Sequence, residues 1–201
     1  LAEEQLRVRG ERLLYHRNQL LALARRDRSD LDEALKEMLA VACTTLRLDR
    51  ASYWRMLPDG AAIRCELVHR ADGAVDPAPA ADALEAIDHP AYFAAIVANE
   101  IVAAEDAASH PATRSLGPVY LKPLGIAATL DAPVWLDGRV VGMVCGEVTR
   151  GTRAWQPEEI DFASGIATMI ALALEASQRR GAEAQLMRPA HYAGPTRLPH
   201  R

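Results

Sequence analysis

The sequence predicts an α+β fold with a central antiparallel sheet, and three observations support this. Leucines near the N-terminus recur at seven-residue spacing, as in a long helix. Two pairs of strand-like segments are each joined by residues suited to a tight turn. A long segment with apolar residues at helical spacing follows the second pair. Several α+β folds share this order of elements, so periodicity alone does not choose among them.

The first two segments are predicted helices. Residues 2–27 contain no Pro and one Gly, with Leu6, Leu13 and Leu20 on one seam. Such a helix is about 40 Å long, more than one face of a small domain covers, so we expect a second copy of the chain to cover the rest. Asp30 is a cap-type residue that begins a second helix ending near Leu48.

The next part predicts an antiparallel pair and then an irregular stretch. The pair comprises 51–57 and 62–69, joined by Pro, Asp and Gly. Residues 72–83 lack periodicity and indicate a surface loop. Asp88 is expected to cap a short helix, a short strand is expected at 101–103, and the helical segments that follow are interrupted by Gly and Pro.

The last third predicts a second hairpin and a long helix. The strands are 126–136 and 139–148, joined by Asp137 and Gly138, which suit a type I′ turn. Pro157 is expected at the first position of a helix that continues past residue 180. The predicted organisation is an N-terminal signalling helix at 1–28, one folded domain at 29–180 and a flexible tail at 181–201. We also expect the chain to be part of a longer protein whose output domain is absent.

Composition argues against several function classes. The net charge is −4 and the chain has no long basic run, so neither nucleic acid nor anionic lipid is an expected partner. No stretch approaches about 20 uninterrupted apolar residues, so no membrane span is expected, and we expect a cytoplasmic protein. The three cysteines are widely spaced and match no zinc pattern, which favours reduced thiols and no metal site.

Several stretches carry a family resemblance. Residues 120–134 (YLKPLGIAATLDAPV), 138–145 (GRVVGMVC) and 155–159 (WQPEE) resemble the second half of GAF domains from bacterial sensor histidine kinases and cyclic-dinucleotide signalling proteins, and 50–54 (RASYW) resemble their first strand. The resemblance implies a central antiparallel sheet with the long terminal helices packed on one face. It also implies a small-molecule pocket on the other face, under the irregular helical segment, and regulation of an attached histidine kinase or cyclic-dinucleotide enzyme in a two-component type of system.

The chain departs from the related domains in two places. Where they carry Cys-His-Glu-His, this chain has Cys, Gly, Glu and Val at 145–148, so haem, metal or bilin binding is not favoured. The signature of cyclic-nucleotide-binding GAF domains is also missing. The cofactor or ligand is therefore unknown at this stage.

No catalytic motif is visible in the sequence, so we expect no enzyme activity from this chain and name no catalytic residue. An alternative is a thiol-dependent methionine sulfoxide reductase of the GAF fold, although Cys43, Cys65 and Cys145 lie on three separate elements. A further alternative is a ligand-free dimerisation spacer. His89 and His110 each precede a Pro at a helix start, where they serve turn geometry, and His16 is expected to be solvated.

Alternation along the second hairpin predicts which residues line the pocket. Met143, Cys145 and Glu147 share one face of their strand, and the small set Val140, Gly142, Val144, Gly146 and Val148 shares the other, suited to helix packing. Asp131 interrupts an apolar strand, where it either makes a structural hydrogen bond or contacts a ligand. The predicted ligand-binding residues are Tyr92, Phe93, Tyr120, Leu124, Thr129, Asp131, Met143, Cys145 and Glu147. The two carboxylates favour a ligand with hydrogen-bond donors or positive charge.

A parallel homodimer is predicted through the first and last helices, because their apolar seams exceed what one sheet face covers. The predicted interface residues are Leu6, Leu13, Leu20, Ile166, Ile170 and Leu174.

Overall fold

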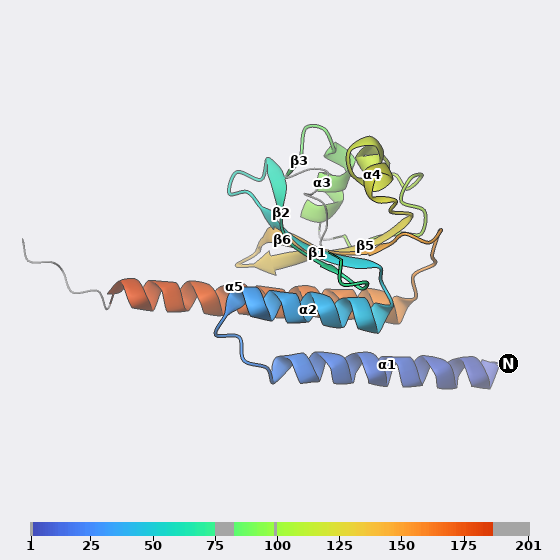
Figure 1. The fold of residues 1–201 in the computed structure, drawn as a ribbon, viewed down its shortest axis with the longest axis horizontal. Helices are drawn as coiled ribbons and strands as arrows, with labels where there is room; N and C mark the ends of the chain where they lie inside the picture. Colours follow the sequence, from blue (N-terminus) through green and yellow to red (C-terminus); the bar gives the residue numbers. More distant parts are fainter. Residues whose placement is uncertain (1, 75–82, 99, 187–201) are drawn as a thin grey trace, which may run out of the picture.

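The computed structural model describes residues 2–74, 83–98 and 100–186, and its centre is a six-stranded antiparallel sheet (Figure 1). The spatial order is β3-β2-β1-β6-β5-β4. The strands are β1 (Arg50–Met56), β2 (Ala62–Arg70), β3 (Ala83–Glu85), β4 (Val102–Ala104), β5 (Ala128–Leu136) and β6 (Arg139–Val148). This confirms the predicted α+β class and both predicted hairpins.

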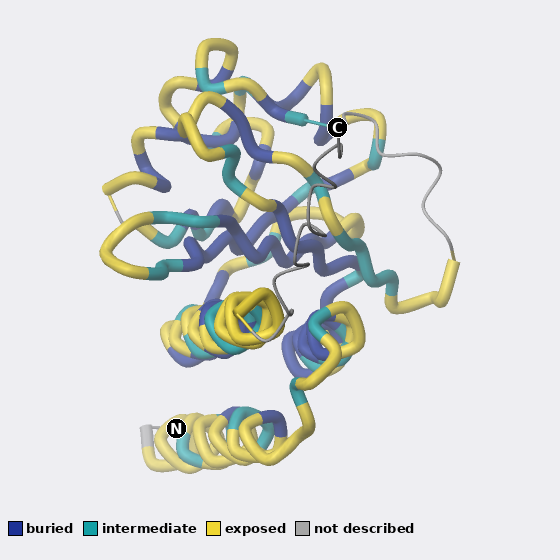
Figure 2. The backbone as a smooth tube through the Cα atoms, turned by 90° about the vertical axis from the view of Figure 1, so that its left-hand side faces the viewer, coloured by how far each residue is buried: buried dark blue, intermediate teal, exposed yellow. Residues whose placement is uncertain are grey.

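Three long helices lie on one side of the sheet. These are α1 (Ala2–Ala24), α2 (Leu31–Leu46) and α5 (Pro157–Leu186). Helices α2 and α5 pack directly on the sheet, and α1 forms an outer layer against α5 (Figures 1 and 2). Most of α1 is exposed, whereas the inner faces of α2 and α5 are buried (Figure 2).

Short helical segments cover the other side of the sheet, and we call them together the lid. They are α3 (Pro90–Val97), the 3₁₀ turn η1 (Arg114–Leu116), the π-helical turn η2 (Gly117–Leu121) and α4 (Lys122–Leu124). Gly125, with φ 67°, ends α4 in the left-handed conformation that favours glycine. The sheet therefore has a helix side and a lid side, each with its own buried apolar cluster.

Local chemistry explains several element boundaries. The Asp30 carboxylate accepts a hydrogen bond from the Glu33 backbone N–H, which caps α2 as predicted. Asp137 and Gly138 have φ angles of 51° and 74°, as a type I′ turn between β5 and β6 requires. The short helix α3 begins after His89 rather than Asp88, because Pro90 occupies its first position and no side chain caps it.

The structure differs from the prediction in two places. β3 was not predicted, because its three residues are too short to show alternation and pair with only one neighbour, β2. Residues 181–186, which the predicted domain boundary assigned to the tail, continue α5, in line with the expected extension of this helix past residue 180. The tail from 187 onwards and the loop at 75–82 lie outside the described residues.

Helix α5 is also long enough and apolar enough to cross a membrane by length and composition. The core helix of a globular domain meets the same criteria. Here its apolar positions Phe162, Ile166 and Ile170 are buried against the helix side of the sheet, which accounts for its composition.

Candidate functional site

The two faces of β6 differ as the alternation predicts. Met143 and Cys145 belong to the buried cluster on the lid side, and Val144 and Val148 belong to the cluster on the helix side. A β-bulge where Val134 and Trp135 pair with β6 shifts the alternation by one residue near the turn. Val140 therefore packs on the lid side and Val141 on the helix side, so the prediction for Val140 was wrong.

A buried carboxylate lies on the lid side of β5. The Tyr92 hydroxyl, from α3, donates a hydrogen bond of 2.9 Å to Asp131 Oδ2, and it lies 3.8 Å from Cys145 Sγ. Asp131 is 3% exposed. Burial raises the pKa of its carboxyl to about 6, although Thr129, Tyr92 and Cys145 favour the charged form. Asp131 thus releases its proton at a higher pH than an ordinary aspartate does.

One oxygen of this carboxylate and the nearby Thr129 hydroxyl are not joined by a well-formed hydrogen bond in the described part of the chain. Asp131 Oδ1 and Thr129 Oγ1 are buried and make no hydrogen bond of good geometry within the described part of the chain. A buried polar atom without a partner costs about 1–3 kcal/mol, so native proteins seldom keep one without a reason. These two atoms, two residues apart on β5, can accept hydrogen bonds from a ligand or from water.

A second buried carboxylate lies further along the lid side, on β6. The Tyr120 hydroxyl, from η2, donates a hydrogen bond of 2.5 Å to Glu147 Oε1. Arg50 Nη1, from β1, lies 2.8 Å from Glu147 Oε2, and both side chains are almost fully buried. Burial, and next the nearby Glu147 charge, raise the pKa of the Tyr120 hydroxyl, which therefore stays a donor.

The two carboxylates differ in charge balance. Glu147 has an arginine partner, so its charge is compensated inside the protein. Within the described part of the chain, the groups around Asp131 are neutral: the Tyr92 phenol, the Cys145 thiol and the Thr129 hydroxyl. The arrangement therefore offers a compensated pair at one end and an uncompensated carboxylate at the other.

The lid is held to the sheet through these tyrosines. Tyr92 ties α3 to Asp131, and Tyr120 ties η2 to Glu147. Phe93 packs edge-on against Tyr92 with ring centroids 6.3 Å apart. Eight of the nine predicted ligand-binding residues thus lie on the lid side: Tyr92, Phe93, Tyr120, Thr129, Asp131, Met143, Cys145 and Glu147. Leu124 packs at the margin of this cluster.

Three residues of β1 belong to this face without having been named as site residues. Arg50 reaches Glu147, and Trp54 packs edge-on against Tyr120 at 5.3 Å between ring centroids. The Trp54 indole N–H donates to Ser52 Oγ at 3.0 Å. The sequence does carry a signal for these residues: polar Arg50 and Ser52 alternate with other residues at the start of β1, and Asp131 interrupts the apolar β5 in a similar way.

The cysteines are arranged poorly for thiol chemistry. Cys43 lies on the helix side, where burial raises the pKa of its thiol to about 12, and Cys145 lies on the lid side, where burial also raises its pKa. Cys65 on β2 and Cys145 on β6 are separated by β1, which places their backbones about 9–10 Å apart. Disulfide formation requires Cα atoms within about 7 Å, so these two cannot pair without movement.

Three histidines, His16, His89 and His110, make polar contacts within the protein. His16, expected to be solvated, is 5% exposed; its Nδ1 lies 3.0 Å from the Glu158 carbonyl oxygen and its ring packs on Phe162. The prediction was wrong because α1 packs on α5. His89 Nδ1 lies 3.1 Å from Ser115 Oγ, and His110 Nδ1 accepts the Ala112 N–H, as turn residues do. No group of three or more metal-ligating side chains occurs among the described residues.

The predicted dimer seam is only partly at the surface. Ile166 and Ile170 are 1% and 0% exposed in the core of their own chain, so they are not available to a second copy, and that part of the prediction was wrong. They face the sheet because α5 is a core helix. Leu20 packs over Gly165 of α5, and Leu174 is partly buried. Leu6 and Leu13 are exposed on α1.

Comparisons with known proteins agree on the architecture. The family model described as GAF domain matches residues 30–174. The blue-light absorbing form of the Thermosynechococcus elongatus PixJ GAF domain is similar at 21% identity, covering 79% of this chain and 92% of that one, with a TM-score of 0.62. The GAF domain of a phosphoenolpyruvate-protein phosphotransferase from Coxiella burnetii is similar at 17% identity, covering 85% and 96%, with a TM-score of 0.63.

A free methionine-R-sulfoxide reductase from Neisseria meningitidis, in complex with its substrate, is similar at 13% identity, covering 82% of this chain and 89% of that one, with a TM-score of 0.62. At these identities the solved structures show the fold alone. A comparison with curated proteins yields no match.

Proposed function

Because the chain belongs to the GAF domain family, we propose that it is a sensory module that binds a small molecule between the sheet and the lid. One observation carries this proposal: two buried carboxylates on the sheet, Asp131 and Glu147, are each occupied by a tyrosine from the lid. A ligand's donors would take the places of these two phenols on the carboxylates. A ligand with N–H or O–H donors, and a positive charge near Asp131, suits this face.

The strand that carries part of the proposed site is directly connected along the chain to the long helices. β6 carries Cys145 and Glu147 and leads through residues 149–156 into α5, whose first turn contacts α1. There the buried Glu158 carboxylate lies 2.8 Å from Arg12 Nη1 and 3.6 Å from Arg9 Nε. When a ligand displaces a lid tyrosine, a shift of β6 passes to α5 and α1. We propose that these helices regulate an attached cytoplasmic output domain, either a histidine kinase or a cyclic-dinucleotide enzyme.

Homodimerisation through α1 is part of the same proposal. Four leucines of α1 are exposed to solvent: Leu6, Leu13, Leu14 and Leu21. Exposed apolar stripes of this kind are typical of interaction surfaces. The test is light scattering at tens of micromolar, with Leu6→Glu and Leu13→Glu introduced together, because neither contacts the core. A dimer that the double variant dissociates supports the proposal, and a wild-type monomer contradicts it.

Binding is tested by a thermal-shift screen with metabolites that carry amine or hydroxyl donors, together with haem and nucleotides. A ligand that prefers the folded state must raise the melting temperature. No hit at millimolar concentrations would favour the dimerisation spacer instead. Turnover of free methionine sulfoxide that depends on added thiol and is lost in Cys145→Ser would instead identify a reductase. We expect no such turnover, since the Cys145 thiol is buried and its pKa is raised.

A further inference from the structure

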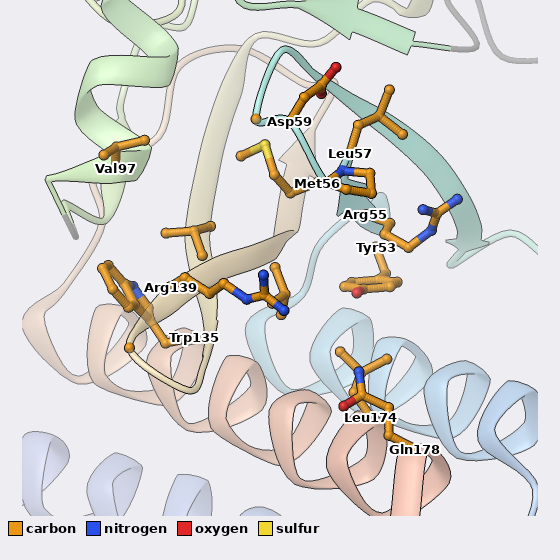
Figure 3. Close-up of a pocket in the computed structure, with 15 residues that line it drawn as sticks. Tyr53, Arg55, Met56, Leu57, Asp59, Val97, Trp135, Arg139, Leu174 and Gln178 are labelled. Carbon is orange, nitrogen blue, oxygen red and sulfur yellow. The ribbon is translucent and has the colours of Figure 1, made fainter. Parts of the chain in front are cut away.

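A groove lies at the end of the sheet formed by the two hairpin turns, away from the Asp131 and Glu147 carboxylates (Figure 3). Its volume is about 550 Å³, within the range of about 300–1,000 Å³ that is usual for small-molecule sites. Four parts of the chain form it: the β1–β2 turn, the β5–β6 hairpin, the end of α3 and the side of α5.

The walls of the groove are mainly apolar. Met56 and Leu57 line it from the first hairpin, Val97 from α3 and Leu174 from α5 (Figure 3). Val97 is 64% exposed, so its side chain is accessible to a ligand in the groove. Apolar walls from four separate elements favour a ligand with a hydrocarbon or aromatic body.

The polar groups of the groove leave a surplus of hydrogen-bond donors. Arg55 is already paired, with its Nε 2.7 Å from Glu66 Oε1, and the Asp59 carboxylate accepts the Ala61 N–H of its own turn. Arg139 extends into the middle of the groove, and within the described residues it makes no ion pair (Figure 3). The Trp135 indole N–H is buried there and has no hydrogen-bond partner in the same part of the chain. Trp135 and Arg139 both lie next to the β5–β6 turn, where Leu136 pairs with Arg139.

We propose that this groove is a second ligand site, which takes an amphipathic carboxylate: one carboxylate attached to an apolar chain or ring. The carboxylate accepts from the Arg139 guanidinium, and the apolar body lies along Met56, Val97 and Leu174. An unpaired guanidinium beside an apolar wall matches this class of ligand in charge and shape. Because Leu174 and Gln178 of α5 line the groove, its occupant also contacts the helix through which the domain is proposed to signal.

The test uses sodium octanoate and 1-octanol as matched probes, measured by isothermal titration calorimetry. Octanoate should bind and octanol should bind at least tenfold more weakly, because only the carboxylate pairs with the Arg139 guanidinium. Arg139→Gln should weaken octanoate about tenfold, equivalent to about 1.4 kcal/mol, and leave octanol unchanged. Arg64→Gln is the matched control, because Arg64 is exposed on β2 and does not line the groove.

Tryptophan fluorescence locates the site, since Trp135 lines the groove and Trp54 and Trp155 are buried elsewhere. Octanoate should change the emission of the wild type but not that of Trp135→Phe. Asp131→Asn should bind octanoate like the wild type, which separates this site from the proposed sheet–lid pocket. The proposal is overturned if octanoate does not bind, if Arg139→Gln binds it normally, or if light scattering shows a dimer that Val97→Glu dissociates, since a second copy then covers the groove.

Discussion

Asp131→Asn tests the electrostatics of the lid side most sharply, because it removes one buried charge at constant shape. The pKa of the Asp131 carboxyl is raised from 3.8 to about 6 in the folded protein. At about 1.36 kcal/mol per pKa unit, this difference of about two units corresponds to about 3 kcal/mol.

The direction of the pH effect follows from which state holds the proton. Below about pH 4 the carboxyl is protonated in both states, and its neutral form is fully accommodated in the core. Between about pH 4 and 6 the folded protein holds a proton that the unfolded chain has released, so the free energy of unfolding falls as pH rises. Above about pH 6 Asp131 is ionised in both states and this contribution is lost.

The assay is urea unfolding of wild type and Asp131→Asn from about pH 4 to pH 7, and the quantity of interest is the difference between the two curves. That difference should change by about 3 kcal/mol in favour of the variant as pH rises. Burial lowers the pKa of His89, which gives an opposite trend in an overlapping range, but His89 is present in both proteins and cancels. Glu183→Gln, at an exposed position of α5, is the control and should not reproduce the change. A difference that stays constant within about 0.5 kcal/mol would refute the reasoning.

Three further predictions concern the elements around the site. Glu147→Gln should lower the free energy of unfolding by about 3 kcal/mol, because it removes the negative charge that faces the buried Arg50 guanidinium, whereas Tyr120→Phe should cost about 1 kcal/mol. Urea unfolding that shows the reverse order would contradict the ion-pair account. Gly142→Ala should destabilise the fold by about 1–3 kcal/mol, since the added methyl would lie too close to the Trp54 carbonyl oxygen. Gly181→Ala, where nothing lies within 4 Å of the added methyl, is the control and should be neutral or stabilising. Equal melting temperatures for the two variants would contradict this prediction. Glu158→Gln should increase hydrogen exchange of α1 while leaving the sheet protected, because Arg9 and Arg12 of α1 both contact the Glu158 carboxylate. Equal loss of protection in both parts would show that α1 is not separately attached.

Periodicity predicted the parts of the fold whose signal is local. Asp137 and Gly138 adopt the positive φ angles that their chemistry favours, and Asp30 caps α2 as expected. β3 escaped prediction because three residues show no period, and Val140 was placed on the wrong face because a bulge is not visible in alternation. Such features depend on pairing between strands, which a single segment does not encode.

The sequence predicted which face of the sheet carries the candidate site, but the partners of its carboxylates became known only from the folded structure. Alternation placed Cys145 and Glu147 together, but the partners of the carboxylates come from 27 to 97 residues away in the chain: Tyr120 and Arg50 for Glu147, and Tyr92 for Asp131. The predicted dimer interface was wrong at Ile166 and Ile170 for a related reason. An apolar helical stripe packs equally well on its own sheet or on a second chain, and sequence spacing does not distinguish the two.

The central claim is that a donor-bearing ligand replaces the lid tyrosines on Asp131 and Glu147. It is tested most directly by one thermal-shift screen of amine-bearing and hydroxyl-bearing metabolites, run in parallel on wild type, Asp131→Asn and Glu183→Gln. The account predicts compounds that raise the melting temperature of wild type and of Glu183→Gln but not of Asp131→Asn. Compounds that stabilise all three proteins equally would contradict it, since binding would then not involve the Asp131 carboxylate.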